Sequence, residues 1–470
     1  MKLSLMKTLR LFLWLVASAT LHAATAADSS GVFNVRDYGA IGDGKHLETA
    51  ALNQAVTACA KAGGGVVYLP PGIYLTGTIV MQSHVTLEIA GGATILGSEN
   101  PKDYLMVNSV WSEGKQIIAS LIYAENAENI TITGRGKIDG QGQVWWQPIL
   151  AAKAKAKSAG ASTASAGPAR LPTSSSASTD RPQLIRLVRC KDIVIERINL
   201  TNSPEWNIHP LLCEFVRVDG VTIQTPVPSP NTDGINPESC RNVQILNCRI
   251  DTGDDCVTLK SGQDELGRRM GKPSENITIM NCVMLHGHGG VTIGSEMSGG
   301  VRNVTVTNCV FQGTDNGIRI KSQRGRGGVV EGLAVTNVAM QDVPHPFLIT
   351  AFYMGNDRPT DVFPVNEGTP RFRDFLFSNI TARGAKDAGS VMGLREMPVE
   401  NLTFNNVHIQ AATGFTCTNA QEISFQDVVI DTDNGPALIQ RSSSGVDTAR
   451  LRTKTPHEGI ALVAQAPPAN

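Results

Sequence analysis

A nine-residue pattern recurs through most of the chain and limits its possible folds more than any other feature. Apolar residues alternate within each copy, as in NVQILNCRI, NITIMNCVM and NVTVTNCVF. From Asp192 onward, successive copies begin 23, 27, 34, 27, 29, 42, 27 and 21 residues apart. A period of twenty-odd residues with insertions is typical of a solenoid, in which each repeat forms one coil and adjacent coils bury a shared core.

The content of each repeat selects the kind of solenoid. Each unit has two short runs rich in β-branched residues around a polar break, and no helix-length apolar segment separates the units. This pattern excludes a leucine-rich horseshoe and a βα barrel. Abundant glycine (46 of 470 residues) and few aromatic residues (5%) also suit short strands with tight turns. We therefore predict an all-β fold, a right-handed parallel β-helix whose coils lie ~4.8 Å apart.

An N-terminal helix is predicted over residues 48–61, ahead of the repeats. Leu52, Val56 and Cys59 fall on one face of this helix, and Gly63 is suited to end it. An amphipathic helix at this place would cap the open end of the solenoid and cover exposed strand edges.

Four further segments complete the expected organisation. Residues 1–26 resemble a signal peptide, with basic residues, an apolar run too short to span a membrane and a small-residue cleavage site. We expect a secreted or periplasmic protein with one β-helix domain over 27–445. The Ala/Ser-rich stretch 151–180 is predicted to be an inserted flexible loop, and 446–470 a flexible tail.

Charge and cysteine content narrow the possible partners. Net charge is −1 and the isoelectric point is about 6.8, so we expect no nucleic-acid or membrane partner. Separately, we expect a monomer. Nine cysteines would permit disulfides in an exported protein. However, Cys248, Cys282 and Cys309 occupy the same slot of three successive repeats. We therefore predict buried free thiols stacked in the interior.

Four segments that follow successive repeats align without gaps: NTDGINPE, GDDCVTLK, GHGGVTIG and TDNGIRIK. Coil stacking would bring their equivalent positions together on one surface. The aligned polar columns place Asp233 beside Asp255, Asp254 beside His288, and Arg319 and Lys321 outside the coil at the edge of the same patch. Three carboxylates, one histidine and two cations are therefore predicted to form one cluster.

Crowded carboxylates favour a functional site over solvated turn residues. Single aspartates are common at turns, but packed like charges repel and raise at least one pKa, a cost that structure alone does not require. Glycoside hydrolysis uses a protonated carboxyl as acid and a second carboxylate as base or nucleophile. Arg319 and Lys321 would suit the carboxylate of a uronate sugar, or they could simply neutralise the aspartates.

The four motifs carry a family resemblance. NTDG at 231–234, GDD at 253–255, GHGG at 287–290 and RIK at 319–321 occur in order, together with SPEWNIHP and VTIGSEMSGGVRNV. Each motif alone is weak, but their order on consecutive coils is specific. The chain resembles glycoside hydrolase family 28, the polygalacturonases, and in particular its bacterial branch, over residues 33–342 or so.

This resemblance implies inverting hydrolysis of α-1,4-linked galacturonan in pectin, without a metal or cofactor. It assigns Asp254 as general acid, Asp233 and Asp255 as the residues that position and deprotonate water, and His288 as the partner of the acid. It assigns Arg319 and Lys321 to substrate binding. Asn231 could also bind substrate, or it could serve only as a turn residue. Inversion requires carboxylates about 6.5–9.5 Å apart, and one to two coil steps of ~4.8 Å bracket that range.

Several alternatives remain open at this point. The substrate could be another pectin backbone, rhamnogalacturonan or xylogalacturonan. The aspartates could hold calcium in a pectate lyase, or the fold could be a non-catalytic glycan-binding β-helix. The insertion before Asp192 suggests action at a chain end. Trp206 and His209 would line the binding groove or pack in a corner, Tyr353 could stack on a sugar, and Glu296 could be an outer contact.

Overall fold

The computed structural model describes residues 31–158, 181–354, 357–454 and 461–466. The predicted signal peptide lies outside these residues. Within the described residues, no helix has both the length and the apolar character needed to cross a membrane.

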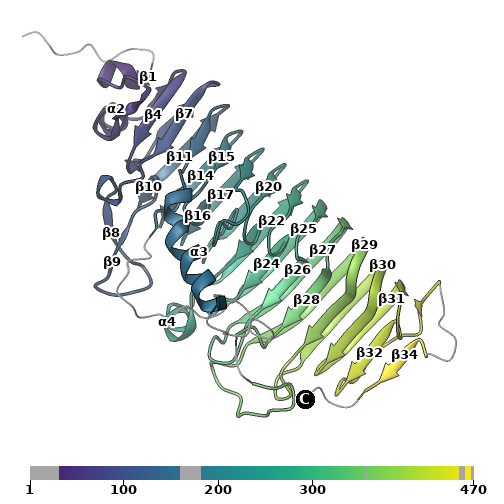
Figure 1. The fold of residues 1–470 in the computed structure, drawn as a ribbon. Coiled ribbons are helices and arrows are strands. Elements are labelled where there is room, and N and C mark those ends of the chain that lie inside the picture. The colour runs from purple at the N-terminus through teal and green to yellow at the C-terminus, as the bar shows by residue number, and fades with distance from the viewer. Residues whose placement is uncertain (1–30, 159–180, 355–356, 455–460, 467–470) are drawn as a thin grey trace, which may run out of the picture.

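The chain forms a right-handed parallel β-helix, as predicted, and Figure 1 shows the coils stacked along one axis. A representative coil contains β16 (Ile208–Leu211), β17 (Glu214–Asp219) and β18 (Thr222–Gln224). Strand β17 pairs in parallel with β14 (Lys191–Glu196) of one neighbouring coil and β19 (Arg241–Leu246) of the other. Each coil thus has three strand positions, one more than the two runs recognised in the repeat.

The three strand positions build three parallel faces. The first face contains β1 (Val32–Asn34), β3 (Gly65–Leu69), β6 (Val85–Ile89), β11 (Glu128–Gly134), β14, β17, β19, β22 (Ser274–Met280), β25 (Val301–Gln312), β27 (Val329–Gln341), β29 (Arg371–Met392), β30 (Val399–Thr418) and β31 (Ala420–Thr432). The second contains β2 (Asp43–Leu47), β4 (Gly72–Thr76), β7 (Ala93–Gly97), β12 (Lys137–Asp139), β15 (Asn199–Thr201), β18, β20 (Arg249–Asp251) and β23 (Val283–Leu285), and continues in β25.

The third face carries the candidate site. Its strands are β5 (Ile79–Val80), β10 (Ile122–Glu125), β13 (Ile185–Val188), β16, β21 (Val257–Leu259), β24 (Val291–Gly294), β26 (Asn316–Lys321) and β28 (His345–Thr350), followed by the ends of β29 and β30 and by β32 (Leu438–Arg441). In β26, Ile318 and Ile320 are buried in the interior and alternate with the outward Arg319 and Lys321, as the sequence parity predicts.

Asparagine ladders hold the bends between coils. Asn276 and Asn303 have left-handed backbone conformations, which asparagine tolerates better than most residues. The Asn276 side-chain amide donates to Asn242 Oδ1 (3.1 Å), and that of Asn303 donates to Asn276 Oδ1 (3.2 Å). Where a repeat starts with asparagine, as at Asn276 and Asn303, that residue thus supplies both the bend and a hydrogen bond to the previous coil.

The interior is a continuous apolar core that includes the cysteines. All nine cysteines are buried and free, and the described residues contain every one of them. The prediction for Cys248, Cys282 and Cys309 is therefore confirmed. At the N-terminal end, α2 (Thr49–Lys61) buries Leu52 and Val56 against the first coils, so the predicted cap is also confirmed.

Two predicted flexible segments differ from the structure. Helix α3 (Gln143–Ser158) covers the start of the stretch predicted as a loop from residue 151, and the rest of that loop lies outside the described residues. The predicted tail is partly wrong, because β33 (Leu451–Arg452) and β34 (Val463–Gln465) pair with β31 and β32. The last complete coil presents unpaired backbone groups, and these short strands satisfy them.

Two insertions stand beside the third face. Strands β8 (Met106–Asn108) and β9 (Gln116–Ile118) form an antiparallel hairpin, and α4 (Asp264–Met270) follows β21. Figure 1 shows both on the same side of the stack. Two 3₁₀ turns, η1 (Val35–Tyr38) and η2 (Pro101–Asp103), complete the N-terminal region.

We predict that the folded protein resists thiol reagents. All nine thiols are buried in the core, so the native protein should react with a disulfide reagent such as DTNB far more slowly than the protein in guanidinium. The denatured protein should titrate nine thiols without prior reduction. Fewer than nine would reveal a disulfide and contradict the interior ladder.

Candidate active site

Strand pairing on the third face brings the four motifs together. Thr258 of β21 pairs with Thr292 of β24, and Thr292 pairs with Arg319 of β26. Glu238 pairs with Lys260 in an isolated bridge one coil earlier. These are the columns obtained by aligning the motifs in the sequence, and that alignment is confirmed.

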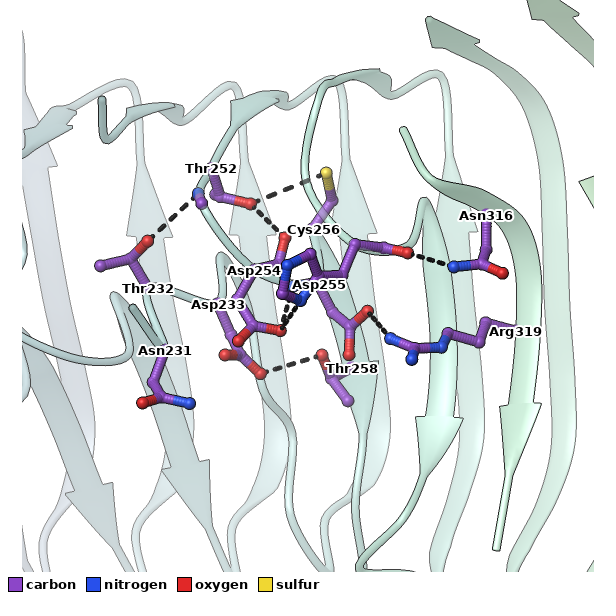
Figure 2. Close-up of polar contacts among 12 residues, drawn as sticks. Asn231, Thr232, Asp233, Thr252, Asp254, Asp255, Cys256, Thr258, Asn316 and Arg319 are labelled. Carbon is purple, nitrogen blue, oxygen red and sulfur yellow. Dashed lines mark hydrogen bonds and ion pairs between the residues drawn. The ribbon is translucent and has the colours of Figure 1, made fainter. Parts of the chain in front are cut away.

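Asp233, Asp254 and Asp255 meet at the centre of this face (Figure 2). One carboxylate oxygen from each lies within 4.8 Å of those of the other two. The expectation of a 6.5–9.5 Å separation is therefore not met for the nearest oxygens. One coil step separates Asp233 from the Asp254–Asp255 pair, and the side chains converge from the two coils.

Asp255 is the charged member of the cluster. Its side chain is 1% exposed, and Lys321 Nζ lies 2.8 Å from Oδ2 while Arg319 Nη1 lies 3.2 Å from Oδ1. Burial would raise the pKa of Asp255, but the charges of Lys321 and Arg319 outweigh it and hold that pKa well below the usual range. Asp255 is consequently an anchored carboxylate with a cation on each oxygen.

Asp233 is the protonated member. It is buried, and its Oδ2 accepts hydrogen bonds from neutral groups, Asn236 Nδ2 at 3.1 Å and Thr258 Oγ1 at 3.3 Å. Burial, and next the charge of Asp254, raises the pKa of Asp233 to about 8. This environment therefore favours the neutral form of Asp233, and the assignment of Asp254 as the general acid stays a prediction.

Asp254 lies on the side of the cluster that faces solvent. Its side chain is 17% exposed, and Oδ1 accepts from the Asp255 backbone N–H (2.9 Å). His288 Nδ1 lies 3.2 Å from the same oxygen. This hydrogen bond raises the pKa of His288, because the carboxylate favours the imidazolium. The structure thus pairs Asp254 with His288, as predicted.

Arg319 and Lys321 lie outside the coil as predicted, but they are not at an open edge. Their side chains are only 12% and 7% exposed. The ring of Tyr353 covers both, with its centroid 4.9 Å from Lys321 Nζ and 5.4 Å from Arg319 Cζ. Tyr353 is therefore packed on the two cations, and both also contact Asp255.

Asn231 lies at the margin of the cluster. Its backbone is left-handed (φ 59°), and its Oδ1 accepts from Arg181 Nη2 at 3.0 Å. Figure 2 shows its side chain apart from the hydrogen bonds among the aspartates. Its role in substrate binding stays a prediction, beside its evident role as a turn residue.

Neighbouring charged residues extend the site toward the N-terminal coils. Lys260 is buried, lies 2.8 Å from Glu296 and stands over the Trp206 ring (4.9 Å). His209 is also buried and bridges Gln183 and Glu238. Lys260 lies at this site but is not among the site residues predicted from the sequence. It lies in the same aligned column as Lys321, and that shared column was the signal that could have identified it.

A glycine makes room for the anchored carboxylate. A Cβ on Gly289 would lie 2.8 Å from Asp255 Oδ1 and 2.3 Å from Thr292 Oγ1. Any larger residue there would displace Asp255 or the strand next to it. Gly289 of the GHGG motif is therefore explained by close packing against Asp255 and Thr292, whereas the adjacent Gly290 leaves room for the Phe311 ring, which would lie 2.9 Å from an added Cβ.

The fold and the site together define a parallel β-helix with a carboxylate cluster of the kind used for glycoside hydrolysis, since one carboxyl is protonated and another is ionised. The chain belongs to the glycosyl hydrolases family 28, whose family model matches residues 70–427.

Individual relatives agree with this assignment. The chain is 35% identical to a probable polygalacturonase of Vitis vinifera, covering 83% of this chain and 77% of that protein. It is 32% identical to an endo-polygalacturonase of Pectobacterium carotovorum subsp. carotovorum (71% and 77%). The crystal structure of a hyperthermoactive exopolygalacturonase from Thermotoga maritima superimposes with a TM-score of 0.73 at 30% identity (86% and 92%).

We predict that Asp233→Asn stabilises the protein increasingly as pH rises. Between pH ~4 and 8 the folded protein keeps the Asp233 proton that the unfolded chain releases, so wild-type stability falls with pH in this window. Asparagine cannot ionise, so the free energy of unfolding of the variant should exceed that of the wild type by on the order of 1–3 kcal/mol at pH 8 and by much less at pH 5. Guanidinium unfolding at several pH values measures this difference.

Asp255→Asn is the matched control, and we expect it to lower the free energy of unfolding rather than raise it. It leaves Lys321 and Arg319 buried without their counter-ion, and we expect a loss on the order of 3 kcal/mol at pH 7. A pH-independent difference between Asp233→Asn and the wild type would contradict the protonation of Asp233.

Proposed function

We propose that the protein hydrolyses α-1,4-galacturonosidic bonds of pectic polygalacturonan. The observation that carries this proposal is the position of Arg319 and Lys321, two cations directly beside a cluster that can supply both an acid and a base. A uronate carboxylate is the substrate group that such a pair recognises. Family membership and the polygalacturonase relatives support the same substrate.

In the proposed mechanism Asp254 is the general acid. It is more exposed than Asp233 and Asp255, so its carboxyl can reach a glycosidic oxygen. The proton rests on Asp233 in the free protein, and docking of the glycosidic oxygen against Asp254 favours its transfer to that carboxyl. Asp254 then protonates the leaving oxygen as the bond from C1 breaks, while Asp233 and Asp255 orient water and Asp233 accepts its proton.

Attack by water is favoured over attack by a carboxylate. Both oxygens of Asp255 are held by cations, which lowers its nucleophilicity, and Asp233 is buried among hydrogen-bond donors. We therefore propose inversion at the anomeric carbon, although the nearest carboxylate oxygens are closer than the usual inverting spacing. Burial, and next the nearby charge of Asp254, raises the pKa of Asp233 and so retains the one proton that the reaction needs.

A calcium-dependent lyase is less consistent with the same cluster. A hard dication requires several free carboxylate oxygens. Both oxygens of Asp255 already lie against cations, Lys321 Nζ at 2.8 Å and Arg319 Nη1 at 3.2 Å. A dication would have to compete with these two cations for Asp255, whereas hydrolysis uses the cluster with the cations in place.

We also propose action at a chain end. The β8–β9 hairpin and α4 stand across the face on the N-terminal side of the aspartates. Trp111 of the hairpin loop packs on Gly262 ahead of α4, where an added Cβ would lie 2.7 Å from the ring. Trp145 of α3 packs edge-to-face on Tyr104 at the base of the hairpin (6.0 Å). The relatives include both an endo-polygalacturonase and an exopolygalacturonase, so their names do not decide the mode of action. The wall formed by the hairpin and α4 is the observation that supports action at a chain end.

Export is proposed from the N-terminal sequence. Residues 1–26 combine basic residues, a short apolar run and a small-residue site, as in secretory signals. A pectic polymer is an extracellular substrate, and an exported enzyme could meet it directly.

We predict slow viscosity loss when the enzyme digests polygalacturonic acid. A chain-end enzyme shortens polymers gradually, so reducing ends should accumulate with little early change in viscosity, and NMR should show the β-anomer first. Activity should be unaffected by a chelator. A rapid viscosity collapse at low conversion would contradict chain-end action, and unsaturated products would contradict hydrolysis.

We predict that the leaving group separates the roles of Asp254 and Asp233. Asp254→Asn should lose at least ~10²-fold in kcat on polygalacturonate, but much less on a nitrophenyl galacturonide, whose leaving group needs no proton. Asp233→Asn should lose activity on both substrates because its water is not activated. The reverse pattern would make Asp233 the acid.

A further inference from the structure

A pocket adjoins the aspartates on the third face, on their N-terminal side. It has a volume of about 1100 Å³ and lies between β13 and β16 on its floor and the β8–β9 hairpin and α4 on its walls. Trp111 and Trp206 contribute aromatic surface, and Arg186 contributes a cation at its floor. The pocket is large enough for more than one pyranose ring, and its use is not explained by the cleavage chemistry described above.

Arg186 is a buried cation without a partner. The residue is 6% exposed, and its guanidinium makes no hydrogen bond or ion pair with any residue that the structure describes. An isolated buried charge is costly, and proteins normally pair it. Arg186 also lines a smaller adjoining cavity of about 250 Å³, so its surroundings are open to a ligand on both sides.

The carboxylates near Arg186 are bound to other groups. Glu238 lies 2.9 Å from His209 Nε2 and accepts from the Gly262 backbone N–H (3.3 Å). Glu296 lies 2.8 Å from Lys260 Nζ. By contrast, the nearby Arg189 already has its counter-ion, Glu125 at 2.6 Å. Glu238, Glu205 and Glu125 act on Arg186 only at longer range, so among the described residues none forms a direct ion pair with this buried cation.

Strand register places Arg186 in line with the catalytic cluster. Arg186 pairs with His209, and the adjacent Ile208 pairs with Ile235, which in turn pairs with Val257 on the coil of Asp254. Arg186 therefore lies three coils before Asp254, or ~14 Å at the strand spacing. Arg319 lies two coils beyond it, on the opposite side. A polymer with one carboxylate per sugar, lying along the axis, would meet both cations.

We propose that Arg186 binds the carboxylate of the terminal uronate in this walled pocket, on the side of the cleaved bond opposite to Arg319. The planar guanidinium can hold a carboxylate through two hydrogen bonds, and a low-dielectric pocket strengthens that contact. Trp206, half-buried at the pocket surface, contributes aromatic surface to the same pocket. This inference rests on the proposed function, and it makes Arg186 the residue that selects an acidic chain end.

The test compares tetragalacturonate with two derivatives, each methyl-esterified at one terminal unit. For the wild type, esterification of the terminal unit that enters the walled pocket should lower kcat/KM about 10- to 100-fold, because Arg186 loses its ionic partner. In Arg186→Met the unesterified substrate should fall by the same factor, and esterification at that end should have no further effect. Arg241→Met is the matched control, because Arg241 lies on β19 of the first face, away from the pocket, and already has Glu214 as counter-ion at 2.6 Å; it should change kcat/KM less than about twofold.

Thermal unfolding separates ligand binding from a structural role. Removal of an unpaired buried cation should leave the melting temperature of Arg186→Met unchanged or raised. A lowered melting temperature with equal losses on all three substrates would overturn the proposal. The proposal would also be overturned if Arg186→Met kept the wild-type ratio of kcat/KM between the acid and the esterified substrates. If the wild type fails to hydrolyse tetragalacturonate at all, the proposed function itself fails, and the two failures are distinguishable.

Discussion

Parallel backbone pairing from coil to coil is the constraint on which the rest of this structure depends. Each strand donates and accepts along the solenoid axis, so a residue on one coil has a fixed neighbour on the next. That register turns a separation of 21 residues between Asp233 and Asp254 into close contact. It equally aligns Arg319 with Thr292 and Thr258, and Arg186 with His209. The chemistry of the protein is therefore arranged along a line parallel to the axis.

Electrostatics within the cluster result from unequal burial and unequal neighbours. Asp255 has two cations and stays ionised, whereas Asp233 has neutral donors and keeps a proton. Asp254 is left facing solvent and His288. Three identical side chains thus have three different surroundings, and the pKa values of Asp233 and Asp255 are shifted in opposite directions, which is the condition for acid and base roles on one surface. The same cations that fix Asp255 are also those suited to an anionic sugar.

Insertions between coils add what the repeat cannot provide. The coil stack by itself would form a long open face, which a polymer could cross in both directions. The β8–β9 hairpin, α4 and the loop around Trp111 interrupt that face on one side. The unpaired Arg186 lies inside the resulting pocket. In this view the coils supply the reaction, and the insertions decide which part of a substrate can reach it.

The repeat determined much of this protein without a structure. Periodic apolar positions determined the β-helix and its interior cysteines, and alignment of four motifs brought Asp233, Asp254, Asp255, His288, Arg319 and Lys321 together, because stacking follows directly from register. Three matters depended on tertiary structure. The location of the proton depends on burial and neighbouring charges, which no spacing encodes. The pairing of β33 and β34 depends on the unpaired edge of the last coil. The pocket around Arg186 depends on a hairpin and a helix from distant segments, whose packing no local pattern specifies.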